Sequence, residues 1–186
     1  MTQYLDKKYI EKNSIEKRDY QVNLASQAID ENCIIVLPTG LGKTAIALTI
    51  IAEYLSKGSG GVLFLAPTRV LVNQHYEFLK EHLTLENISL ITGEDSIEKR
   101  TKLWKCSVIC ATPEIARNDF ARGIISSEQF TLVIFDEVHR TVGDYAYSGI
   151  AERFEDTNVR LVGMTATLPS EKEKAREIMT RLKISC

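Results

Sequence analysis

The stretch that most constrains the fold is PTGLGKT, which occupies residues 38–44. It follows a short apolar run, 34–37, and opens a helical pattern at Lys43. A phosphate-binding loop of this kind wraps phosphates with backbone N–H groups and a helix N-terminus. It therefore needs glycine only where the backbone turns left-handed or approaches closely. Leu37 stands where such loops usually have their first glycine, and we expect it at the strand end, where a side chain is accommodated.

The rest of the chain alternates short apolar runs with longer helical patterns. The runs are apolar at both odd and even positions, as in strands that are covered on both faces of the sheet. The predicted strands are 34–37, 62–66, 88–91, 108–111, 132–135 and 160–164, and the predicted helices are 19–30, 43–56, 70–82, 96–104, 114–122, 149–154 and 170–182. This alternation predicts an α/β three-layer sandwich, with a mostly parallel sheet and helices on both faces.

The bulk composition is that of an ordinary globular protein. The chain has 186 residues, 44% of them hydrophobic and 26% charged, with a net charge of −2. This charge argues against a protein that holds nucleic acid by bulk charge alone. The sequence has no apolar stretch of about 20 residues and no apolar N-terminal segment, so we expect neither a membrane span nor secretion. A cytoplasmic location, or a nuclear one in a eukaryote, fits cysteines that form no metal-binding pattern.

Each position of the loop has an expected task. The backbone of the loop is expected to cradle the phosphates of ATP, with Lys43 at the β- and γ-phosphates and Thr44 at Mg²⁺. The predicted phosphate-contacting residues are Thr39, Gly40, Leu41, Gly42, Lys43 and Thr44. A glycine-rich turn with a solvated lysine is the simpler alternative. The coincidence of strand, loop, GKT and helix favours the nucleotide site.

Two carboxylates follow the predicted strand at 132–135. Asp136 and Glu137 would lie at its carboxyl end, where open α/β sheets place their sites. We expect Asp136 to hold Mg²⁺ through water, and Glu137 to orient and deprotonate the attacking water. Such a pair alone would be a surface cap. Together with GKT about 90 residues upstream, it predicts a catalytic set of Lys43, Asp136 and Glu137.

The order of motifs resembles the first RecA-like lobe of superfamily 2 helicases of the DExH branch. The matching segments are RDYQ (18–21), PTGLGKT (38–44), APTRVLV (66–72), TGE (92–94), ATPE (111–114), DEVH (136–139) and TAT (165–167). NDFARG (118–123) and GDYAY (143–147) are most similar to the archaeal Hef helicase/nuclease and Fanconi anaemia M translocase family. The chain departs from that family's pattern at Glu114 and Asp144. The resemblance implies that Gln21 contacts the adenine edge, with Arg18 or Tyr20 against the ring.

A second set of residues follows other predicted strand ends. Hydroxyls and N–H groups there can hold the phosphates of one nucleic-acid strand without contacting bases, and an arginine adds a cation. Each Pro-Thr, Thr-Gly or Thr-Pro pair alone is better explained as a turn or a helix cap. The repetition of such pairs along one sheet edge favours phosphate contacts. The predicted nucleic-acid-binding residues are Thr68, Arg69, Thr92, Gly93 and Thr112.

Three further residues are expected to connect the two sites. By the resemblance, Thr165 and Thr167 couple the ATP site to the nucleic-acid face, with His139 as their partner; His139 as a plain polar strand-end residue is the alternative. His75 and His82 are seven apart on one helix face. We predict them to be solvated or boundary residues, because no carboxylate or cysteine completes a metal set.

These inferences predict an N-terminal extension, 1–17, and one RecA-like lobe, 18–186. The resemblance implies the ATP-binding lobe of a DNA helicase or translocase that acts on forked or branched DNA in the repair of stalled forks. An ATPase lobe acting on double-stranded RNA and a non-hydrolysing nucleotide-binding module are the alternatives. Too few residues follow Thr167 for a second lobe, which would supply catalytic arginines. We therefore expect weak ATP binding and slow turnover by this chain alone.

Overall fold

The computed structural model describes residues 2–58, 60–141, 145–167 and 172–184. Its strands are β1 (Cys33–Val36), β2 (Gly61–Leu65), β3 (Ile88–Ile91), β4 (Val108–Ala111), β5 (Phe130–Phe135) and β6 (Arg160–Thr165). Its α-helices are α1 (Asp19–Asp30), α2 (Lys43–Lys57), α3 (Arg69–His82), α4 (Ile97–Leu103), α5 (Pro113–Ala121), α6 (Tyr145–Ala151) and α7 (Lys172–Arg181). Short 3-10 turns are η1 (Ser127–Gln129), η2 (Val138–Thr141) and η3 (Glu152–Phe154).

The predicted elements are confirmed, with most ends displaced by one or two residues. The prediction was wrong for the helix at 149–154, which begins four residues earlier, at Tyr145, and ends in the turn η3. The run YAYS contains aromatic residues and a serine, which are modest helix formers, so local propensity gave little signal there. The first two residues of the predicted helix 170–182 lie outside the described residues.

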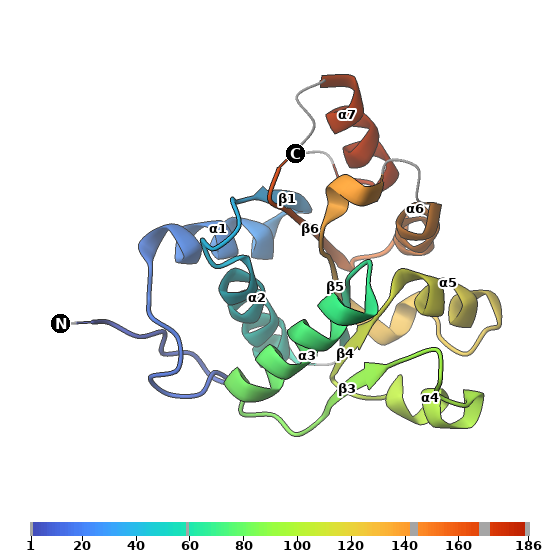
Figure 1. The fold of residues 1–186 in the computed structure, drawn as a ribbon, viewed down its shortest axis with the longest axis horizontal. Coiled ribbons are helices and arrows are strands. Elements are labelled where there is room, and N and C mark those ends of the chain that lie inside the picture. The colour runs from blue at the N-terminus through green and yellow to red at the C-terminus, as the bar shows by residue number, and fades with distance from the viewer. Residues whose placement is uncertain (1, 59, 142–144, 168–171, 185–186) are drawn as a thin grey trace.

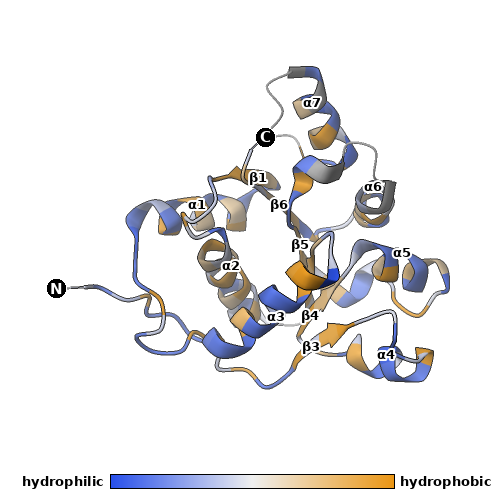
Figure 2. Ribbon diagram, viewed as in Figure 1, coloured by the Kyte–Doolittle hydropathy of each residue, from blue (hydrophilic) through white to orange (hydrophobic). Residues whose placement is uncertain are grey.

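All the strand pairs are parallel, and the sheet has the order β1-β6-β5-β2-β4-β3 (Figure 1). Alternate strand residues enter two separate cores. Val62 and Phe64 of β2 join α1, α2 and α3 in one core, whereas Leu63 and Leu65 join α5, α6 and α7 in the other. The strands are correspondingly rich in apolar residues, as β1 and β3 show (Figure 2). The predicted three-layer α/β sandwich with a parallel sheet is confirmed.

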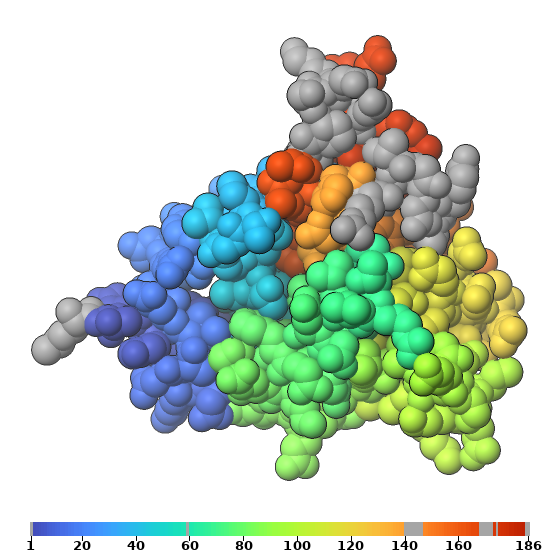
Figure 3. Space-filling view, viewed as in Figure 1, coloured from blue at the N-terminus to red at the C-terminus, as the bar shows by residue number. Residues whose placement is uncertain are grey.

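Residues 2–17 pack against the lobe. Leu5 and Ile10 are buried in the core formed with α1, α2 and α3. Ile10 pairs with Leu83 in an isolated antiparallel bridge, and Lys7 forms an ion pair with Glu53 of α2 at 2.7 Å. The N-terminal segment accordingly lies beside the end of α3 in the space-filling view (Figure 3). The segment thus shares the core of the lobe.

A buried carboxylate ties α4 to α5. Asp119 is fully buried and accepts hydrogen bonds from Arg100 Nε at 2.8 Å, Arg100 Nη2 at 3.0 Å and Trp104 Nε1 at 2.8 Å. The hydrogen bond and charge of Asp119 raise the pKa of Arg100. Arg100 Nη1 also donates to the carbonyl of Asp95 at 2.7 Å, in the loop after β3. The aspartate of the NDFARG segment is therefore a structural anchor for that loop.

We expect Asp119→Ala to lower the free energy of unfolding by about 3–5 kcal/mol, because it leaves the part-buried Arg100 guanidinium and the buried Trp104 N–H without their acceptor. Urea unfolding measures the change. Glu98→Ala removes an exposed ion pair with Lys102 in the same region and should cost at most about 0.5 kcal/mol. Equal losses in the two variants would contradict the anchoring role of Asp119.

Candidate nucleotide site and nucleic-acid face

The loop between β1 and α2 has the backbone of a phosphate cradle. Gly40 and Gly42 have φ of +85° and +87°, in the left-handed region that favours glycine. Leu37 is buried at the end of β1, and its N–H donates to the Thr165 carbonyl at 3.0 Å. Lys43 Nζ donates to the Leu37 carbonyl at 2.9 Å. The expectation that a side chain is accommodated at Leu37 is confirmed.

The RDYQ segment contacts this loop directly. Gln21 is buried, and its Nε2 donates to the Leu41 carbonyl at 3.0 Å. The Tyr20 hydroxyl donates to the same carbonyl at 2.8 Å, and Arg18 Nη1 lies 3.4 Å from the Tyr20 oxygen. The structure thus brings the predicted adenine-contacting residues to the loop. Their contact with the base stays a prediction.

Asp136 is held at the carboxyl end of β5 by both its backbone and its side chain. Its N–H donates to the Leu65 carbonyl at 2.8 Å, and its carbonyl accepts from the Tyr147 hydroxyl at 2.7 Å. Its carboxylate oxygen Oδ2 lies 2.6 Å from His75 Nε2. Tyr147 belongs to the GDYAY segment and packs edge-on against Phe135. The sequence marked this segment as a family feature, but gave no sign that its last tyrosine supports Asp136.

The prediction that His75 is a solvated or boundary residue was wrong. The residue as a whole is 8% exposed and belongs to the buried stripe of α3 with Val72 and Leu79. Its ring packs on Phe64, with centroids 4.4 Å apart. The imidazole is tolerated there because its polar edge is bonded to Asp136, a pairing across the fold that helix periodicity cannot indicate. His82 is half-buried against Phe78, as the prediction allowed.

The predicted coupling residues form a connected group at the ends of β5 and β6. His139 Nδ1 lies 3.2 Å from Glu137 Oε2 and 2.8 Å from Thr165 Oγ1. The fully buried Thr165 donates its hydroxyl to the Thr167 carbonyl at 2.7 Å. Glu137 has φ of +55°, an uncommon backbone conformation for a residue with a side chain. The structure therefore joins the proposed catalytic glutamate to β6, while their roles stay predictions.

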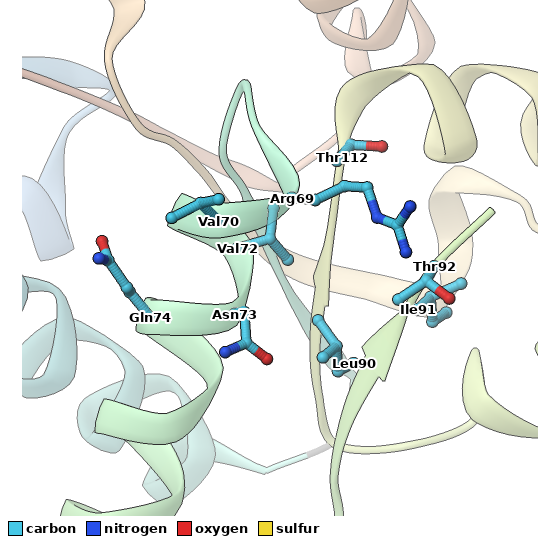
Figure 4. Close-up of a pocket in the computed structure, with 9 residues that line it drawn as sticks. All are labelled: Arg69, Val70, Val72, Asn73, Gln74, Leu90, Ile91, Thr92 and Thr112. Atoms are coloured by element: carbon cyan, nitrogen blue, oxygen red, sulfur yellow. The ribbon is translucent and has the colours of Figure 1, made fainter. Parts of the chain in front are cut away.

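The second set of residues surrounds a groove at the other half of the same sheet edge. The groove has a volume of about 470 Å³. It is lined by Arg69, Val70, Val72, Asn73, Gln74, Leu90, Ile91, Thr92 and Thr112 (Figure 4). Arg69 extends from α3 toward Thr92 and Thr112 in the same view. The structure thus brings three of the predicted phosphate contacts together.

Part of this set is also engaged locally. The Thr68 hydroxyl caps α3 by accepting from the Leu71 N–H at 3.2 Å, so cap chemistry explains one of its tasks. Thr92 donates its N–H and hydroxyl to Asp95 Oδ2 at 2.7 Å and 3.0 Å. Arg69 forms an exposed ion pair with Glu94 at 2.8 Å. Thr68 and the exposed Gly93 adjoin the groove in sequence but do not line it.

The residues of the nucleotide site suit Mg²⁺. Thr44 and Asp136 supply hydroxyl and carboxylate oxygens, the ligand type that this hard cation prefers. In the described residues, no group of three or more His, Cys, Asp or Glu side chains could hold a metal by itself. Water and nucleotide phosphates usually complete a Mg²⁺ shell, so this small donor set fits such an ion. None of the helices in the described ranges is long and apolar enough to cross a membrane.

Comparison with known proteins decides the family. The profile of the DEAD/DEAH box helicases matches residues 18–175. The chain belongs to the DEAD/DEAH box helicase family. The helicase domain of Hef from Pyrococcus furiosus is 42% identical, covers 96% of this chain with 39% of its own, and has a TM-score of 0.90. The RecA-like fold and the similarity to Hef are therefore confirmed.

Two curated relatives extend this result. A protein of Methanocaldococcus jannaschii, named provisionally as an ATP-dependent RNA helicase, is 40% identical over 184 residues, in a match that covers 97% of this chain and 24% of that protein. The ATP-dependent DNA helicase MPH1 of Candida albicans is 34% identical over 189 residues, covering 96% of this chain and 16% of that helicase. The lobe thus spans about a quarter or less of the length of these relatives.

The two loop glycines provide a matched test of the site. Both have positive φ, so alanine at either should cost about 1–2 kcal/mol. An added Cβ at Gly42 would lie 2.2 Å from Gln21 Nε2, whereas one at Gly40 meets nothing within 4 Å. The amide ends a flexible side chain and can move, giving up its bond to Leu41. Gly42→Ala should therefore destabilise the lobe by about 1 kcal/mol more than Gly40→Ala.

Urea unfolding of both variants, repeated with Gln21→Ala, measures this difference. It should disappear when Gln21 is absent, because the two positions then no longer interact. A difference that persists without Gln21 would contradict the packing of Gln21 on the loop.

Proposed function

We propose that this chain is the ATP-binding lobe of an ATP-dependent DNA helicase or translocase that acts on forked or branched DNA. The observation that carries this proposal is the division of one sheet edge into two halves. The strands β1, β6 and β5 are neighbours and end at the nucleotide site, whereas β2, β4 and β3 are neighbours and end at the groove. This division supports a phosphate cradle and a face for a nucleic-acid strand that lie side by side on one sheet.

In the nucleotide site, each residue has one task. Lys43 neutralises charge on the β- and γ-phosphates of ATP, while the amides that follow Thr39 surround them. Asp136 and Thr44 hold Mg²⁺, which when bound neutralises charge on the transferred phosphoryl group. Glu137 orients the attacking water and accepts its proton. Its contact with His139 offers a link by which β6 influences that orientation.

On the nucleic-acid face, the residues contact phosphates and make no contact with the bases. The hydroxyls of Thr92 and Thr112 and the guanidinium of Arg69 border the groove. Threonine hydroxyls, helix N-terminal amides and one cation suffice to follow a backbone. This mode of binding suits a chain whose net charge is −2.

A second lobe is part of this proposal. Helicases of this class hydrolyse ATP between two RecA-like lobes, and the second contributes arginines worth about 10³–10⁵ in rate. The proposed partners are therefore DNA and the second lobe of the longer parent protein. RNA, tested here as a duplex, is the second candidate substrate, because the Methanocaldococcus jannaschii relative is named as an RNA helicase.

The experiment compares nucleic acids with a protein that includes both lobes. Forked DNA should raise ATP turnover, and duplex RNA of equal length should not; Glu137→Gln supplies the blank. Affinity for DNA falls as salt rises. Arg69→Ala should make the slope of log affinity against log salt shallower by about one, because it removes one phosphate contact. Arg122→Ala, at the far end of α5 from Thr112, should leave the slope unchanged.

Stimulation by duplex RNA, and not by forked DNA, would replace the first candidate with the second. Equal salt slopes for the two arginine variants would remove Arg69 from the binding face.

A further inference from the structure

The contact between His75 and Asp136 is the least expected polar contact in the lobe. Nε2 and Oδ2 are 2.6 Å apart, and the two side chains are only 11% and 5% exposed. A carboxylate oxygen only accepts, so the imidazole Nε2–H donates. His75 lies on α3, less than two turns beyond Arg69, and is buried, whereas the groove residues Asn73 and Gln74 on the same helix are exposed.

The backbone of Asp136 is already fixed without His75. Leu65 accepts its N–H, and the Tyr147 hydroxyl donates to its carbonyl. The orientation of the carboxylate is a separate matter, because the terminal torsion of aspartate is broad and roughly two-fold. His75 fixes this torsion by binding Oδ2. In the part of the chain that the structure describes, Oδ1 has no hydrogen-bond partner, which leaves it for a metal ion or its water.

The ring of His75 is itself well placed. It packs on Phe64, and Phe64 lies on β2 beside Ile134 of β5, two residues before Asp136. The strand pair that carries Asp136 therefore also sets the plane of the imidazole. Hydrogen bonds from an outer residue to a ligating carboxylate commonly orient it, and their loss lowers metal affinity about 10–100-fold.

We propose that His75 is a positioning residue for Mg²⁺ binding: by holding Oδ2, it directs Oδ1 of Asp136 toward the metal that accompanies ATP. This proposal rests on the proposed function, because it takes Asp136 as the metal-binding carboxylate. It makes α3, which begins at the nucleic-acid face, a direct neighbour of the metal ligand.

Four variants separate positioning from packing. Glutamine places its Nε2 near that of histidine and can donate to Oδ2, whereas asparagine is one methylene shorter. Phenylalanine keeps the ring contact with Phe64 but has no donor. His82→Phe is the matched control, because His82 lies on the same helix and packs on Phe78 at the same 4.4 Å centroid distance.

The measurement is binding of a fluorescent, non-hydrolysable ATP analogue by this chain, titrated with Mg²⁺ and repeated in EDTA. His75→Phe and His75→Asn should raise the Mg²⁺ concentration for half-maximal enhancement by about 10-fold or more. His75→Gln and His82→Phe should stay close to the unaltered chain, and binding in EDTA should be the same in all. Thermal melting by circular dichroism identifies any variant that is not folded.

An unchanged Mg²⁺ requirement in folded His75→Phe would overturn the proposal, as would equal impairment of the glutamine and asparagine variants. That pair differs by one methylene and decides the question if the phenylalanine variant is not folded. A chain that binds no nucleotide with or without Mg²⁺ would contradict the proposed function itself, and this proposal with it.

Discussion

The parallel hydrogen bonding of the six strands is the constraint on which the sites depend. Because every strand runs the same way, all the carboxyl ends meet at one edge of the sheet. The crossovers then order that edge as β1-β6-β5-β2-β4-β3. The residues proposed for the nucleotide site follow the first three strands of this order, and the groove lies at the ends of the last three. The boundary between the halves falls between β5 and β2, the pair with matched residues from Gly61 to Leu65.

Contacts across that boundary link the two halves. The Asp136 N–H donates to Leu65 of β2, and its carboxylate meets His75 of the helix that follows β2. On the other side of Asp136, His139 connects Glu137 to Thr165 of β6. The residues proposed for hydrolysis are therefore in contact with the groove half of the sheet edge and with β6. A shift of α3 against β5 would change the contact between His75 and the Asp136 carboxylate.

Most of the fold could be predicted from the sequence, because strands and helices bury apolar residues with distinct periods. The ends of β3, β4 and α1 fell where expected. The start of α6 did not, since Tyr147 is held by tertiary contacts with Asp136 and Phe135 that propensity cannot represent. Leu37 could be placed because glycine is required only where φ is positive, as at Gly40 and Gly42.

The candidate site could be predicted as a set of motifs, but not as a set of contacts. His75 was predicted to be solvated or at a boundary because no carboxylate or cysteine completes a metal set with it, and its actual partner lies 61 residues away. The NDFARG segment was a family feature without a physical reason until Asp119 proved to be the acceptor for Arg100 and Trp104. In both cases a polar residue can be buried because it bonds to a partner that is distant in sequence.

The central claim is that this lobe binds Mg²⁺ and ATP through the PTGLGKT loop. Calorimetric titration of the unaltered chain with ATP and Mg²⁺, beside Lys43→Ala, tests it most directly. The account predicts weak but saturable binding of one nucleotide, reduced about 10-fold or more by the loss of a charge-assisted contact. Absence of binding, or equal affinity in the two proteins, would contradict it.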